Sequence, residues 1–196
     1  MSNKNKYNNT KQVLECGIRA LGGKGNERKF SITFSSEEPC KRYFGIEILD
    51  HSEGCIDLTR LKEIGVVLFN HDRDNVLGKV LDVSVQNGRG IATIEFDKDD
   101  DAEKIYKKVV NGTLKGVSIG YVVDTWEEVK VGKTSLDGRF VGPCSIAKRW
   151  VPYEISIVSV PADITVGVGR SMKNNLPMYE KQIKINKENF ERLRGK

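Results

Sequence analysis

The chain has 196 residues, of which 38% are hydrophobic, enough for one domain with a core and additional polar tails. No apolar run approaches the roughly eighteen residues of a membrane helix, and the opening MSNKNKYNNTKQ lacks the apolar core of a secretion signal, so we expect a soluble, intracellular protein without a membrane partner. The net charge is +5, but residues 1–12 carry +3 and residues 173–196 carry +4, which leaves −2 for the remainder; a nucleic-acid-binding domain would carry its positive charge on the folded part, so we predict no specific nucleic-acid partner.

The strand signals begin after a polar, asparagine-rich segment, residues 1–12, for which we expect disorder. KFSITFS alternates so that Phe30, Ile32 and Phe34 share one face, and RYFGIEIL is predicted to continue as a strand. A turn-rich stretch follows. Residues 65–69 are then predicted to form a buried strand and residues 78–85 another, and the turn dipeptide Asn-Gly at 87–88 predicts a hairpin into GIATIEF.

The clearest helix signal is DDDAEKIYKKVVNG, with acidic residues at its start, lysines near its end and Asn-Gly as its stop. Its predicted apolar stripe consists of Ala102, Ile105, Tyr106, Val109 and Val110. A strand in LKGVSIGYVV follows, then a polar excursion over residues 125–148, then a strand in VPYEISIVSVPAD. The pattern predicts a mainly β fold with helices (α+β), built on an antiparallel core that closes into a barrel.

The cysteines and histidines raise the question of a metal site. The four cysteines are Cys16, Cys40, Cys55 and Cys144. They are widely separated and form no C-x-x-C pair, which predicts free thiols. Zinc ligation could start from His51 and Cys55, with Cys40 or His71 as a further ligand, but no second closely spaced pair supports it. We therefore predict no metal and no cofactor.

Three polar residues at strand ends have the chemistry of a nucleophilic hydrolase. Ser118 is flanked by Gly116 and Gly120, either so that a substrate can approach or because another element packs tightly there. His71 follows a buried strand, as a structural turn residue or as a base. Glu154 opens the last strand, either at an exposed lip or with a partner. A serine needs a base to take its proton and a third group to hold the imidazole.

Three motifs in order resemble those of the tailed-phage prohead (capsid maturation) serine proteases of the HK97 type. They are NHD…LGKV at residues 70–80, GTLKGVSIGYVV at 112–123 and YEISIVSVPAD at 153–163, with a helix between the first two. GVSIG also fits the G-x-S-x-G pattern of α/β-hydrolases, but here the helix precedes the serine, and His71 comes before Ser118 in the chain.

The resemblance implies a β-barrel flanked by helices, related in fold to the herpesvirus maturational proteases. It implies a serine endopeptidase in which Ser118 is the nucleophile, His71 the base and Glu154 the third member, with Asp72 as the fallback. His51 precedes His71 and is in the wrong chain order for the second histidine of the herpesvirus relatives. For the oxyanion donors we expect backbone N–H groups of the strand from Gly116 or groups near Lys148 and Arg149.

The same resemblance implies that the substrate is the major capsid protein, a scaffold protein or the chain itself, cleaved inside the immature capsid (prohead) in the host cytoplasm. We expect a homo-oligomer with a polar tail at 1–12, a protease domain at 13–170 and a basic tail at 171–196 that docks the enzyme, is removed by self-cleavage or has no role. The alternative is a non-enzymatic capsid-assembly or scaffold protein that keeps the protease fold.

Overall fold

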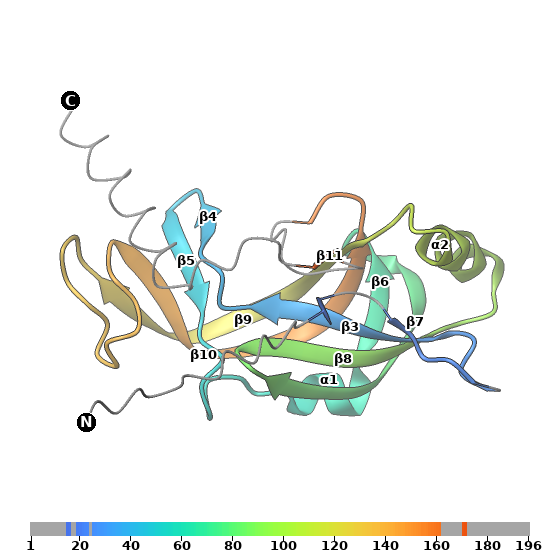
Figure 1. Ribbon diagram of the computed structural model, residues 1–196, viewed down its shortest axis with the longest axis horizontal. Helices are drawn as coiled ribbons and strands as arrows, with labels where there is room; N and C mark the ends of the chain where they lie inside the picture. The colour runs from blue at the N-terminus through green and yellow to red at the C-terminus, as the bar shows by residue number, and fades with distance from the viewer. Residues whose placement is uncertain (1–14, 17–18, 24, 162–169, 172–196) are drawn as a thin grey trace, which may run out of the picture.

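The computed structural model describes residues 15–16, 19–23, 25–161 and 170–171 (Figure 1). The strands are β1 (Glu15–Cys16), β2 (Arg19–Ala20), β3 (Lys29–Ser36), β4 (Cys40–Arg42), β5 (Gly45–Leu49), β6 (Val66–Phe69), β7 (Asp72–Gln86), β8 (Arg89–Phe96), β9 (Gly116–Val129), β10 (Cys144–Val158) and β11 (Arg170–Ser171), and the helices are α1 (Thr59–Ile64) and α2 (Asp100–Val110). Within these residues no helix is long and apolar enough to cross a membrane.

One large sheet dominates the molecule, and β10 is its organising strand. The order is β2-β3-β8-β7-β6-β10-β5-β4, and β9 pairs with β10 in addition. The β9–β10 pairing is antiparallel and runs from Cys144↔Val129 to Val158↔Gly116. Both β5 and β6 pair with β10 in the parallel direction, at different points along it. This arrangement brings strands that are far apart in sequence to the same place on β10.

The prediction of a mainly β, α+β fold is confirmed, but a closed barrel is not. Among the described residues no pairing joins β9 to β2 or β3, so the hydrogen-bonded sheet stays open there. The main core lies under the curved sheet and includes Phe30, Ile32 and Phe34 of β3, which are buried as predicted. A smaller core packs under the β4–β5 hairpin and the far part of the β9–β10 ribbon, at the end of the molecule opposite α2 (Figure 1).

Several predicted strands have different limits in the structure. RYFGIEIL is split into β4 and β5 by a turn at Tyr43 and Phe44, where Gly45 has φ +138°. The predicted polar excursion over 125–148 was wrong, because β9 continues to Val129 and β10 begins at Cys144. The six-residue helix α1 was not predicted. The expected tails at 1–12 and 171–196 lie outside the described residues, apart from Ser171.

The predicted helix is present as α2. The Asp99 side chain accepts hydrogen bonds from the N–H groups of Asp101 and Ala102, which is the usual way a helix N-terminus is capped. Ala102, Ile105 and Val109 are buried. Val110 is 56% exposed, so its inclusion in the apolar stripe was wrong. It lies in the last turn and points away from the core, whereas its neighbour Val109 is buried.

Candidate active site

His71 sits in a two-residue turn between β6 and β7. Phe69 pairs with Asp72, which leaves Asn70 and His71 as the loop, with φ +51° and +63°. These values match a type I′ hairpin turn, in which both loop residues have positive φ. Asparagine tolerates this conformation well, but a histidine at the second position is uncommon and costs about 1–2 kcal/mol. A residue kept there against its conformational preference is a candidate for function.

The imidazole of His71 is held by Glu154. The Nδ1 atom lies 2.6 Å from Glu154 Oε1; the His71 side chain is 45% exposed and that of Glu154 only 8%. The turn reaches β10 because β6 pairs with it in parallel, Leu68 opposite Ser156. The fallback carboxylate, Asp72, instead accepts a hydrogen bond from the N–H of Asp74. Glu154 is therefore the carboxylate that the fold brings to the ring.

Sequence reasoning missed Ser156. Its hydroxyl donates to Glu154 Oε2 at 2.8 Å and accepts the backbone N–H of His71 at 3.1 Å. Ser156 is fully buried. Its two hydrogen bonds link the carboxylate to the turn that carries the histidine. A signal existed: Ser156 is two residues after Glu154, so strand alternation places both side chains on one face.

Ser118 lies on β9 directly opposite Ser156, and Gly120 lies opposite Glu154. A β-carbon built on Gly120 would come within 2.6 Å of Glu154 Oε1 and 2.5 Å of the Tyr153 ring, and one on Gly116 within 2.6 Å of the Val158 carbonyl oxygen. Both glycines thus allow close packing against β10, as one of the two interpretations expected. The glycine at 120 makes room for the carboxylate that holds His71.

Ser118 and His71 line the same pocket, of about 410 Å³, together with Glu154 and Arg73. Within the described part of the chain the Ser118 hydroxyl makes no hydrogen bond, so it is available to meet a substrate. A second, smaller pocket of about 50 Å³ lies on the other side of Ser118, between β9, β3 and the β4–β5 hairpin. It occupies the opening where the sheet does not close.

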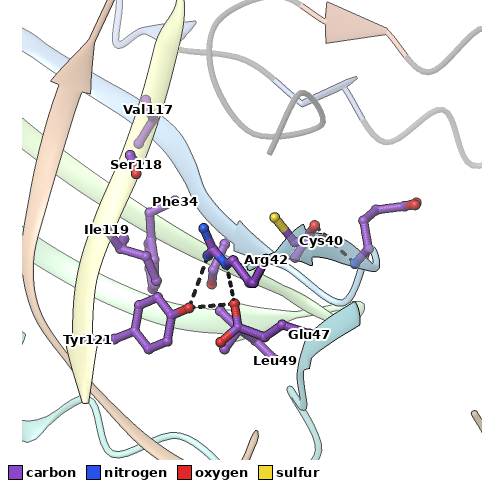
Figure 2. A pocket seen from close by; sticks show the side chains of 12 residues that line it. Phe34, Cys40, Arg42, Glu47, Leu49, Val117, Ser118, Ile119 and Tyr121 are labelled. Carbon is purple, nitrogen blue, oxygen red and sulfur yellow. Dashed lines mark hydrogen bonds and ion pairs between the residues drawn. The ribbon is translucent and has the colours of Figure 1, made fainter. Parts of the chain in front are cut away.

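Arg42 forms part of the wall of both pockets, and Figure 2 shows it in the smaller one. Its Nε donates to the buried Glu47 carboxylate at 2.6 Å and its Nη2 to the Tyr121 hydroxyl at 3.0 Å, while that hydroxyl donates to Glu47 at 2.7 Å. Burial and the hydrogen bond to Glu47 raise the pKa of Tyr121 above its usual range. The three groups hold one another, so a fixed guanidinium borders the space beside Ser118.

The groups proposed near Lys148 and Arg149 do not reach this space. Lys148 Nζ binds the fully buried Asp50 at 2.5 Å, and Arg139 binds the same carboxylate. Burial alone would raise the pKa of Asp50, but the hydrogen bonds from Lys148, Ser52 and Arg139 outweigh it and hold the pKa below its usual range. Arg149 is 69% exposed beside Asp124. Neither Lys148 nor Arg149 lines either pocket.

The second histidine, His51, is buried and both ring nitrogens are used. Nδ1 lies 2.8 Å from the Leu49 carbonyl oxygen, and Nε2 lies 2.7 Å from Ser35 Oγ. No lone pair remains for a metal. Across the described residues, no cluster of three histidine, cysteine or acidic side chains could bind one, and Cys40, Cys55 and Cys144 form no disulfide.

Comparison with known proteins identifies the family. Residues 48–177 match the model of the caudovirus prohead serine proteases. A stretch of 141 residues, 70% of this chain, is 39% identical to 22% of a protein named major capsid protein from Halomonas phage phiHAP-1. A stretch of 122 residues, 60% of the chain, is 29% identical to 52% of a prohead protease from Escherichia phage T5.

No solved structure matches this chain. The chain spans about a fifth of the length of the first relative and about half that of the second. The family match covers more than half of the chain and includes the segments that carry His71, Ser118 and Glu154. The chain belongs to the caudovirus prohead serine protease family.

Proposed function

We propose that this chain is a serine endopeptidase that removes extensions from capsid or scaffold protein inside the prohead, with Ser118 as nucleophile, His71 as base and Glu154 as the carboxylate that orients the base. The observation that carries the proposal is the 2.6 Å contact between His71 Nδ1 and Glu154 Oε1 in a pocket that Ser118 also lines. With Nδ1–H donated to the carboxylate, Nε2 carries the lone pair that can take a proton from Ser118.

The proposed reaction is acyl transfer in two halves. Ser118 Oγ attacks the scissile carbonyl carbon while its proton moves to His71 Nε2, and the tetrahedral intermediate expels the amine, which takes that proton. Water then attacks the acyl-enzyme with His71 again as base, and the new carboxylic acid leaves as Ser118 regains its proton. Glu154 stabilises the imidazolium in both halves. The hydrogen bond between a catalytic serine and its histidine base often shortens only when substrate is bound.

Ser156 acts in this scheme as a positioning residue. It holds Glu154 Oε2 through its hydroxyl and the His71 backbone through its oxygen, so the carboxylate and the turn move together. Arg42 supplies a fixed positive charge beside Ser118, where negative charge develops on the scissile carbonyl oxygen. Neither group forms or breaks a covalent bond.

The substrate is proposed from the family and from the relatives. The family is one of prohead proteases, and one relative is named as a major capsid protein, matched over only 22% of its length. The same name supports the alternative function, a capsid-assembly protein that retains the protease fold without cleavage.

The deciding experiment is intact-mass analysis after co-expression with the capsid protein of the same phage. We expect the wild-type chain to shorten the capsid protein or itself, and Ser118→Ala to leave both whole. Ser35→Ala is the matched control, because Ser35 also contacts a histidine but is buried. Assembled shells that contain this chain and in which every polypeptide keeps its full mass would establish the non-enzymatic alternative.

The carboxylate is tested separately. Glu154→Gln should lower kcat by about 10⁴-fold, because an amide no longer fixes the productive tautomer of His71. Asp72→Asn should change it little, since the Asp72 carboxylate accepts only the Asp74 N–H. A large loss of kcat with Asp72→Asn and a small one with Glu154→Gln would show that Asp72, and not Glu154, is the third member.

A further inference from the structure

A pocket of about 560 Å³ continues from the His71–Ser118 pocket along β10, and no role has been given to it. The two pockets share four residues: Leu68, Arg73, Tyr153 and Glu154. They therefore form one groove, with His71 and Ser118 at one end. Its volume is in the range of sites that bind ligands through several side chains.

The walls of this pocket are aliphatic. They are formed by Val66 and Leu68 of β6, Val76 of β7, Val122 of β9 and Val151 of β10. Val76 is 42% exposed and Val122 is 56% exposed, although both lie on long strands of the main sheet. Covering such surface with an aliphatic side chain gives about 25 cal/mol per Å².

Two arginines border the same pocket, Arg60 from α1 and Arg73 from β7. Within the described part of the chain neither makes a hydrogen bond or an ion pair. This contrasts with Arg42 and Arg139, whose guanidinium groups are tied to buried carboxylates. The acidic residue in the pocket, Glu154, forms no ion pair with either arginine; its two carboxylate oxygens contact His71 and Ser156.

We propose that this groove is a substrate subsite that selects an acidic side chain two residues away from an aliphatic one in the extended peptide being cleaved, because residues at that spacing point to the same side. A carboxylate can accept paired hydrogen bonds from an arginine fork, while the aliphatic side chain covers the valines. The occupant is a peptide segment because the groove runs directly into the pocket of Ser118 and His71. The inference rests on the proposed function for its substrate, but peptide binding can be measured without cleavage.

The test uses the full-length Ser118→Ala chain and fluorescein-labelled decapeptide pools. Each pool is random except at two positions: one is fixed as glutamate, glutamine or lysine, and the position two residues away is valine. Separate sets of pools place this pair at different points along the peptide. Fluorescence anisotropy should show about tenfold tighter binding of the glutamate pool than of the glutamine pool at one position, and the weakest binding for lysine. Arg60→Gln and Arg73→Gln should each reduce that ratio, and the double variant should bring it to about one.

Arg149→Gln is the matched control, because Arg149 is exposed and lines neither pocket; it should keep the full ratio. Arg73→Glu should reverse the preference towards lysine. The absence of binding, equal binding of all three pools, or binding of a single-stranded oligonucleotide in place of the peptides would overturn the proposal. Cleavage of the same pools by the wild-type chain separates the two claims. Cleavage without a glutamate preference removes the subsite and keeps the protease, and glutamate-selective binding without any cleavage does the opposite.

Discussion

The two histidines of this chain can each be compared with a serine. His51 contacts Ser35, and His71 lines the same pocket as Ser118. His51 Nε2 is 2.7 Å from Ser35 Oγ, whereas Ser118 makes no such contact within the described residues. On distance alone Ser35 and His51 form the better nucleophile–base pair. Yet both are buried, at 3% and 5% exposure, while the His71 side chain is 45% exposed beside a pocket.

The third partner separates the two pairs more clearly than access does. His51 Nδ1 meets the neutral carbonyl of Leu49, and burial lowers the pKa of His51. Its imidazolium form is therefore disfavoured. His71 Nδ1 instead meets the negatively charged side chain of Glu154, at 2.6 Å. A short serine–histidine contact is thus compatible with a purely structural role, and the group behind the imidazole is the better guide to chemistry.

The largest effects are expected from substituting the two histidines, one of which should affect the cleavage rate and the other the free energy of unfolding. His71→Gln should reduce cleavage by at least about 10⁴-fold with little loss of stability, because the side chain is half exposed. His51→Gln should lower the free energy of unfolding by about 1–3 kcal/mol, because it disturbs a buried hydrogen-bonded pair, and should keep cleavage per folded molecule. Cleavage rates and urea unfolding on the same samples check both. Comparable loss of activity in the two variants would remove the distinction.

A smaller effect is expected from Gly120→Ala. The added β-carbon would lie within 2.6 Å of Glu154 Oε1, so the carboxylate must move away from His71. A misplacement of about 1 Å costs about 10²-fold in rate. Gly22→Ala is the control, since no atom lies within 4 Å of its β-carbon position. Steady-state kinetics of both variants should show the loss in kcat for Gly120→Ala alone; an unchanged kcat would mean that the carboxylate position does not matter.

The smallest effect concerns pH. Burial lowers the pKa of His51 from 6.5, the Leu49 carbonyl and the Glu37 and Asp50 charges oppose this shift, and Arg89 adds to it. The unfolded chain therefore binds a proton at His51 near pH 6.5, whereas the folded chain does not. The contribution of His51 to the free energy of unfolding should be fully present above pH 6.5 and should decrease as the pH falls below it. Asp50, whose pKa is also lowered, loses its contribution only below its ordinary 3.8.

Urea midpoints at pH 7.5, 6.5 and 5.5 measure this dependence. The urea midpoint should fall more steeply towards pH 5.5 in the wild-type chain than in His51→Gln, because the variant lacks the histidine that is protonated only on unfolding. The slope m at each pH checks that the same surface is exposed on unfolding. Parallel declines in the two proteins would assign the pH dependence to other groups.

Local patterns predicted the parts of the fold that depend on local physics. The alternation of Phe30, Ile32 and Phe34, the Asn87–Gly88 turn and the capped helix α2 all have short-range causes and are present in the structure. The outer half of the β9–β10 ribbon was missed because most of its β9 side chains are exposed and polar, which resembles a loop in sequence. The helix α1 has six residues and one buried side chain, Leu61, too little for a periodic signal.

The candidate site depended on information of another kind. His71 and Glu154 are 83 positions apart and meet because β6 and β10 pair in parallel, which no local pattern records. The residues were selected through the family motifs, and the structure adds how they are held. Ser156 was within reach of sequence reasoning, since its spacing from Glu154 places it on the same face. The pockets that flank Ser118 were not, because each is lined by side chains from several strands that are distant in sequence.

The parallel pairing of β6 with β10 also sets when the site can exist. It joins segments about 88 positions apart, so it closes a long loop and belongs with the slow, long-range steps of folding. Until it forms, His71 has no carboxylate beside it and Ser118 no base. On the proposed function, a newly made chain is therefore inert during synthesis and gains activity only with its finished architecture. Activity is thus tied to completion of the large sheet.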